Sequence, residues 1–144
     1  MSEFEPGGVG GGWLGTYAYK GTARDRPPVR FEATLTEPDG EGAFSGTILD
    51  DGRLGEAAVS GGQSGRGIRF TKTYRRRGLA AIFYEGTLTE DGRTMAGTWR
   101  IAGDVHGVWD ARRTWSLSER DAAEAEEWVE EWVEERAREV VRLG

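Results

Sequence analysis

The chain has 144 residues, a formal net charge of −6 and no cysteine, so it excludes disulfides, thiolate metal sites and a thiol nucleophile. No apolar run is long enough to span a bilayer, and the start, MSEFEPGGVGGG, lacks the regions of a signal peptide. Residues 118–144, with ten carboxylates and four arginines, carry the whole excess charge, and the rest is neutral. We therefore expect a cytoplasmic protein with neither membrane nor nucleic-acid partners, because nucleic-acid binding requires a basic field.

Alternation of apolar and polar residues dominates the chain after a glycine-rich segment, residues 1–12, which we predict to be a flexible leader. Aspartate-glycine pairs and other glycines recur between the alternating runs, as tight hairpin turns require. The predicted strands are residues 13–20, 29–36, 42–50, 54–61, 67–74, 80–88, 93–101 and 106–113. Short turns between successive strands favour an antiparallel meander.

Large aromatic side chains share the inward faces of these strands with glycines at positions 15, 46, 86, 97 and 107. Glycine weakens a strand, so its recurrence implies tight bending or room beside a large ring. We predict an all-β fold, an eight-stranded antiparallel up-and-down barrel over residues 13–115. The inward aromatic residues are Trp13, Tyr17, Tyr19, Phe31, Phe44, Phe70, Tyr74, Tyr84, Trp99 and Trp109.

The character of the chain changes at its C-terminal end, where residues 116–144 are predicted to form an acidic amphipathic α-helix. Ser118 is the expected N-cap, and Asp121 follows three residues later. The helix is too polar to be buried on all sides, so its apolar stripe must pack on something. That partner is either its own barrel or another protein, including a second protomer. The expected partner-binding residues are Trp128, Val129, Trp132 and Val133.

The first and last strands of the predicted barrel resemble those of the calycin superfamily, which includes lipocalins, fatty-acid-binding proteins and avidins. The resemblance rests on Gly11-Gly12-Trp13 in the first strand and Arg113 in the last. It implies that Arg113 packs across the indole of Trp13 and closes one end of the barrel. The segment EGTLTEDGRTMAGTWRI is similar to avidin hairpins. Avidins hold biotin with an asparagine, and this chain has none, so we do not expect biotin binding.

A ligand pocket is predicted at the open end of the barrel. A buried phenol needs a hydrogen-bond partner, and a strand backbone already committed to its ladder cannot satisfy four tyrosines. We therefore expect some of them to surround a wet mouth that a ligand can enter. The predicted ligand-binding residues are Tyr17, Tyr19, Lys72, Tyr74, Tyr84, Trp99 and Trp109.

Lys72 stands out because it shares the inward parity of Phe70 and Tyr74. An unpaired cation inside a barrel is costly. Lys72 can therefore pair with an interior carboxylate, extend out of the mouth, or bind an anionic ligand. A bulge that turns it outward is the remaining alternative.

Two other features have several interpretations. Residues 75–77, three consecutive arginines, form a solvated turn, a gate for anionic ligands, or a dock for the acidic helix of another copy. His106, the only histidine, is predicted to face outward, and a lone histidine cannot build a multi-histidine metal site.

No nucleotide-binding, catalytic-triad or metal-binding motif is present, so we expect no cofactor, no metal and no catalytic residue. The sequence favours a non-enzymatic barrel that binds a small aromatic or amphipathic molecule, with an anionic group as one option. The alternative is a packed scaffold whose C-terminal helix mediates homo-oligomerisation or docking to a partner protein. An isomerase or cyclase acting in the barrel pocket is the third option, and only fold analogy supports it.

Overall fold

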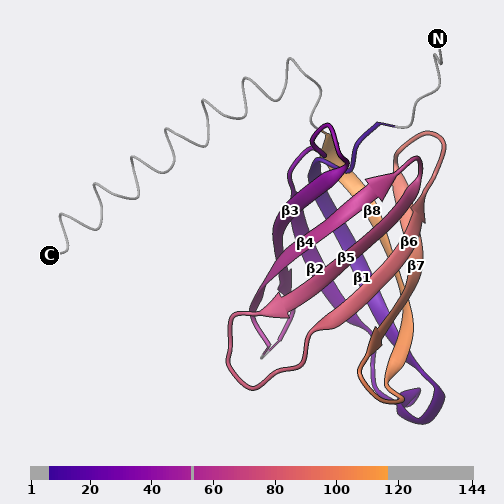
Figure 1. Ribbon diagram of the computed structural model, residues 1–144. Helices are drawn as coiled ribbons and strands as arrows, with labels where there is room; N and C mark the ends of the chain where they lie inside the picture. The colour runs from indigo at the N-terminus through magenta and orange to yellow at the C-terminus, as the bar shows by residue number, and fades with distance from the viewer. Residues whose placement is uncertain (1–6, 53, 117–144) are drawn as a thin grey trace, which may run out of the picture.

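The computed structural model describes residues 7–52 and 54–116, which form one closed antiparallel barrel (Figure 1). Every strand pairs with its neighbours in sequence, and the last strand pairs with the first. A short 3-10 helix, Gly21–Ala23, follows the first strand. The strands are β1 (Gly11–Lys20), β2 (Val29–Leu35), β3 (Ala43–Asp50), β4 (Glu56–Ser64), β5 (Gly67–Tyr74), β6 (Ile82–Leu88), β7 (Thr94–Ile101) and β8 (His106–Ser116).

This architecture confirms the predicted eight-stranded up-and-down barrel. The predicted strand ends differ from the observed ones by at most three residues. Residues 117–144 of the predicted C-terminal helix, including Trp128, Val129, Trp132 and Val133, lie outside the described residues, and Ser116, its expected first residue, instead ends β8. Among the residues that the structure describes, no helix is long and apolar enough to cross a membrane.

Alternation along the strands sends one set of side chains into the barrel. Nine of the ten predicted inward aromatic residues are buried, and Tyr19 is half-buried. Their rings pack closely, as in the stacked pair of Phe70 and Tyr84, whose centroids are 4.6 Å apart. Glycines provide the room: a Cβ on Gly107 would lie 2.7 Å from the indole of Trp99, and one on Gly86 would lie 2.6 Å from Trp109.

One end of the barrel, the upper end in Figure 1, is covered by residues 7–10, which belong to the segment that we expected to be a flexible leader. Residues 7–10 instead pack against the barrel, and β1 begins at Gly11 rather than at position 13. Val9 is fully buried, and its carbonyl oxygen accepts a 2.8 Å hydrogen bond from the indole nitrogen of Trp13. Its backbone nitrogen donates to the side-chain oxygen of Gln63 at 3.0 Å. We call this the closed end.

Arg113 connects the leader to the barrel wall at the closed end. Its guanidinium lies over the Trp13 ring, 4.5 Å from the centroid. Three of its nitrogens donate to the carbonyl oxygens of Gly8, Gly10 and Gly92 at 2.7–2.9 Å. Burial lowers the pKa of Arg113. The single arginine therefore satisfies backbone acceptors that the glycine-rich leader brings into the barrel end.

Candidate functional site: the mouth of the barrel

The opposite end of the barrel contains a cavity of about 170 Å³, which we call the mouth pocket. It lies where β1, β5, β6 and β7 meet the loops at that end, the lower end in Figure 1. Most of its surface is aromatic or aliphatic, and one arginine borders it. The lining residues are Tyr17, Tyr19, Arg26, Leu54, Tyr74, Leu79, Ala80, Ile82, Tyr84, Trp99 and Ile101.

Deeper inside the barrel than the mouth pocket, Lys72 on β5 forms an ion pair with Asp50 at the end of β3. The ammonium nitrogen lies 2.7 Å and 2.8 Å from the two carboxylate oxygens. Both side chains are almost completely excluded from solvent. The structure thus selects one of the predicted alternatives for Lys72, an interior carboxylate partner.

Two tyrosines complete the coordination of the carboxylate. The hydroxyl of Tyr17 donates to Oδ2 of Asp50 at 3.2 Å, and the hydroxyl of Tyr74 donates to the same oxygen. The ammonium of Lys72 also lies 4.9 Å and 4.8 Å from the ring centroids of Tyr17 and Tyr74. We call Asp50, Lys72, Tyr17 and Tyr74 the buried polar cluster. No buried side-chain nitrogen or oxygen of the described residues lacks a hydrogen-bond partner.

Burial determines the protonation behaviour of this region. It raises the pKa of Tyr17, Tyr74 and Tyr84 well above the ordinary value of 10.0, and the negative charge of Asp50 raises all three further. Burial lowers the pKa of Lys72, and the attraction of Asp50 opposes that shift. The phenols are therefore neutral hydrogen-bond donors at neutral pH, and none is poised to act as a base.

Perpendicular ring contacts hold one wall of the mouth pocket. The ring of Trp99 lies edge-to-face with Tyr17 and Tyr19, at centroid distances of 5.9 Å and 5.1 Å. Its indole nitrogen donates to the carbonyl oxygens of Ala18 and Val108. Arg26 lies over the outer side of Tyr19, 5.3 Å from the ring centroid. The wall is thus fixed by packing, with a cation at its rim.

Five of the seven predicted ligand-binding residues line the mouth pocket: Tyr17, Tyr19, Tyr74, Tyr84 and Trp99. Lys72 lies beneath the pocket and is not among its lining residues. Trp109 also lies outside it, packed edge-to-face against Phe70 and Tyr84 at 5.7 Å from each. Its indole nitrogen donates to the backbone oxygens of Glu85 and Thr98. The position of Trp109 is that of a core residue.

Sequence reasoning missed Asp50 and the aliphatic rim of the pocket. Asp50 shares the parity of Phe44 and Ile48 on β3, so alternation alone placed its carboxylate inside the barrel. It lay within the predicted strand 42–50, but it was not singled out as a partner for Lys72. Leu79 and Ala80 reach the pocket from the β5–β6 loop, which period-two alternation does not describe.

Residues 75–77 and His106, which the sequence also singled out, are not among the residues that line the pocket. Residues 75–77 are exposed on the β5–β6 loop, and Arg75 forms an exposed ion pair with Glu56 at 3.2 Å. His106 is exposed, as predicted, and its Nδ1 lies 2.9 Å from the carbonyl oxygen of Asp104.

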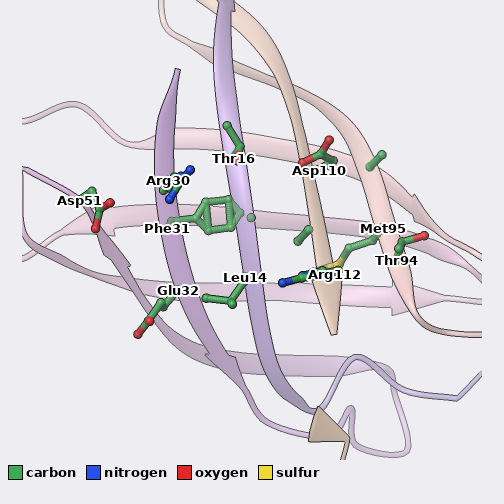
Figure 2. Close-up of a pocket in the computed structure, with 13 residues that line it drawn as sticks. Leu14, Thr16, Arg30, Phe31, Glu32, Asp51, Thr94, Met95, Asp110 and Arg112 are labelled. Atoms are coloured by element: carbon green, nitrogen blue, oxygen red, sulfur yellow. The ribbon is translucent and has the colours of Figure 1, made fainter. Parts of the chain in front are cut away.

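A larger groove, of about 840 Å³, crosses the outer wall over β1 (Figure 2). Figure 2 shows Arg30 and Asp51 on one side of β1 and Asp110 and Arg112 on the other. These charged side chains are exposed, and within the described parts of the chain no ion pair joins them. The mouth pocket is the better candidate site because it is less open than the groove and its lining is mostly aromatic or aliphatic.

Residues 7–52 and 54–116 contain no group of three or more histidine, aspartate or glutamate side chains that could hold a metal ion. The chain matches no protein-family model, and no curated protein shows significant similarity to it.

Proposed function

We propose that the protein is a non-enzymatic binding module whose mouth pocket takes one aromatic ring system carrying an anionic group. The ring enters between the tyrosines and Trp99, and the anion stays at the rim beside Arg26. The observation that carries this proposal is the aromatic cavity at whose edge the described residues place one cation, Arg26.

The volume of the pocket limits the size of the ligand. Pockets for drug-sized molecules measure about 300–1,000 Å³, whereas a dry apolar cavity of about 150 Å³ can bind benzene. A cavity of about 170 Å³ therefore suits one ring system rather than a long acyl chain. Of the two ligand classes that the sequence left open, this size favours the aromatic one.

The placement of charge determines the orientation of the ligand. Asp50 neutralises Lys72, so the lysine is not available as the anchor of an anionic group. Arg26 is exposed at the rim, and its guanidinium has five hydrogen-bond donors. We infer that a carboxylate on the ligand points outward to Arg26. The nearest interior carboxylate is engaged by Lys72 and two phenols, which favours binding over catalysis.

We also propose that the barrel is calycin-like. The packing of Arg113 across the Trp13 ring supports this assignment, because it is the contact that the resemblance implies. In such a barrel one end is closed and the opposite mouth receives the ligand. The position of the mouth pocket is consistent with that arrangement.

Calorimetric titration with three probes tests the proposed function: indole-3-acetate, neutral indole and decanoate. We expect indole-3-acetate to bind most tightly and decanoate to bind least. Replacing Arg26 by glutamine should weaken indole-3-acetate but leave indole unchanged. Arg24→Gln is the matched control, because Arg24 lies on the same loop and donates to Gly21 instead of lining the pocket.

A pocket-filling variant provides the second test. Ala80 is exposed on the β5–β6 loop and lines the pocket, so Ala80→Phe should block binding without disturbing the core. Ala102→Phe, an exposed position on another loop at the same end, should bind normally. Equal binding by both variants, or tighter binding of decanoate than of indole-3-acetate, would refute the proposed site.

A further inference from the structure

The two ends of the barrel carry opposite charge. The described residues of the four mouth loops include five arginines, at 24, 26, 75, 76 and 77, against three aspartates, at 25, 51 and 104. The three loops of the closed end carry five acidic residues, at 37, 39, 41, 90 and 91, against two arginines, at 66 and 93. The mouth therefore attracts anions and the closed end repels them.

The C-terminal segment has the chemistry that the mouth pocket favours. Residues 126–135 read EEWVEEWVEE, so Trp128 and Trp132 each stand between pairs of glutamates. An indole is a single ring system, and the flanking carboxylates complement the arginines around the mouth. The four residues from Glu126 to Val129 thus combine the aromatic and anionic features of the proposed ligand.

The geometry of the barrel favours the segment of a second copy over the chain's own. β8 ends at Ser116, where it pairs with Gly11 at the closed end. From there back to His106, β8 rises about 33 Å, or about 25 Å along the axis of a tilted barrel. The segment that follows Ser116 therefore leaves the barrel about 25 Å from its own mouth and would have to run back along the whole barrel wall to reach it, whereas the mouth of a second copy requires no such path.

We propose that the mouth pocket of one copy binds Trp128 or Trp132 of a second copy. This inference rests on the proposed function, since it names the ligand of the same pocket. Each copy has one mouth and one acidic segment, so the contact is heterologous and links copies head to tail. Small aromatic anions compete for the pocket and shorten the assemblies.

Sedimentation velocity of the full-length protein over a range of concentrations tests this proposal. We expect concentration-dependent assembly that weakens at high salt, because exposed charges are screened. Trp128→Ala/Trp132→Ala should weaken it by more than about 30-fold, as the loss of an interface tryptophan does. Trp115→Ala is the matched control, because Trp115 is exposed on β8 and leaves the segment intact.

Replacing arginines by glutamates at either end of the barrel distinguishes a specific contact at the mouth from a general effect of net charge on assembly. Arg76→Glu/Arg77→Glu should abolish assembly, whereas Arg66→Glu/Arg93→Glu, which makes the same charge change at the closed end, should not. All four arginines are exposed, so both variants should fold. Equal loss in the two variants would overturn the proposal.

A mixing experiment gives the most specific outcome. The Trp128→Ala/Trp132→Ala protein keeps its mouth, and the Arg76→Glu/Arg77→Glu protein keeps its segment. We expect each alone to be monomeric and the mixture to form a one-to-one complex that grows no further. A wild type that stays monomeric at all concentrations, or a mixture without a complex, would overturn the proposal.

Binding of indole-3-acetate to the Trp128→Ala/Trp132→Ala protein distinguishes the two claims. If it binds there and wild type does not assemble, the pocket function stands and the head-to-tail contact is refuted. If indole-3-acetate does not bind and the wild type does not assemble, the pocket function and the head-to-tail contact are both refuted. If the wild type assembles and indole-3-acetate dissociates it, both are supported.

Discussion

Lys72 on β5 and Asp50 on β3 form an ion pair inside the barrel, with the ammonium nitrogen 2.7 Å from a carboxylate oxygen. Tyr17 and Tyr74 donate to the same carboxylate, so every partner of the pair is internal. Removing water from two charges costs several kcal/mol per ion, which the short contacts must offset. The pair forms the floor beneath the mouth pocket, so its integrity determines the shape of the site.

Replacing one member of this ion pair should destabilise the fold more than replacing both members. Lys72→Met leaves Asp50 charged, buried and without its cation, and should lower the free energy of unfolding by about 3–5 kcal/mol. Lys72→Met/Asp50→Asn buries no charge and keeps an acceptor for the two phenols, so it should cost less than Lys72→Met alone. Urea unfolding followed by circular dichroism measures both. Additive costs of the two single changes would contradict the coupling.

Alkaline pH should unfold the protein through its buried tyrosines. The pKa of Tyr17, Tyr74 and Tyr84 is raised in the folded state, so above about pH 10 the unfolded chain loses protons that the folded chain keeps. Stability is therefore full below pH 10 and falls as pH rises beyond it. The lowered pKa of Lys72 acts in the opposite direction, but one lysine opposes three phenols.

A spectroscopic pH titration checks this expectation. Phenolate absorbance from three of the four tyrosines should appear together with the loss of circular dichroism, rather than near the ordinary pKa. Ionisation of all four in the folded protein near pH 10 would show that the tyrosines are not buried against Asp50.

The stability of the closed end should depend on the hydrogen-bonding geometry of the Arg113 guanidinium as well as on its charge. Lysine at position 113 keeps the charge but cannot donate to the carbonyls of Gly8, Gly10 and Gly92 together. We expect Arg113→Lys to lower the free energy of unfolding by about 2–3 kcal/mol. Arg112→Lys, at an exposed position on the same strand, should be nearly neutral. Equal effects of the two changes would show that the carbonyl contacts contribute nothing.

Mid-strand glycines should differ sharply in their tolerance of a methyl group. A Cβ on Gly97 would clash with the carbonyl oxygen of Glu85 on the paired strand, and backbone atoms cannot move aside cheaply. Gly97→Ala should therefore cost about 1–3 kcal/mol or more. A Cβ on Gly62 meets nothing closer than 3.8 Å, so Gly62→Ala is the matched control. Thermal unfolding measures the stability of both variants. Equal stability would show that close contact with the paired strand is not the reason for glycine at position 97.

Alternation and turn residues were sufficient to predict the barrel, because a period of two shows which side chains face inward. Alternation does not show how deep a side chain lies along the barrel axis. Trp99 and Trp109 were therefore indistinguishable in the sequence, although one lines the mouth pocket and the other packs in the core.

Two features of the structure were not anticipated, for different physical reasons. The leader looked flexible because glycine carries no side chain to bury, but its carbonyls are what Arg113 binds. Asp50 followed the inward alternation of β3 and lay within the predicted strand, but alternation does not show which polar groups meet inside the barrel. Its pairing with Lys72 joins residues 22 positions apart, which no local pattern reveals.

Mapping indole-3-acetate by NMR on the full-length protein tests the central claim most directly. We predict that amide shifts concentrate at the mouth, around Arg26, Leu54, Ala80 and Ile101, and that Trp13 and Gly92 at the closed end stay unchanged. Shifts confined to the outer groove around Leu14 and Arg112, or no shifts at saturating probe, would contradict a ligand site in the mouth.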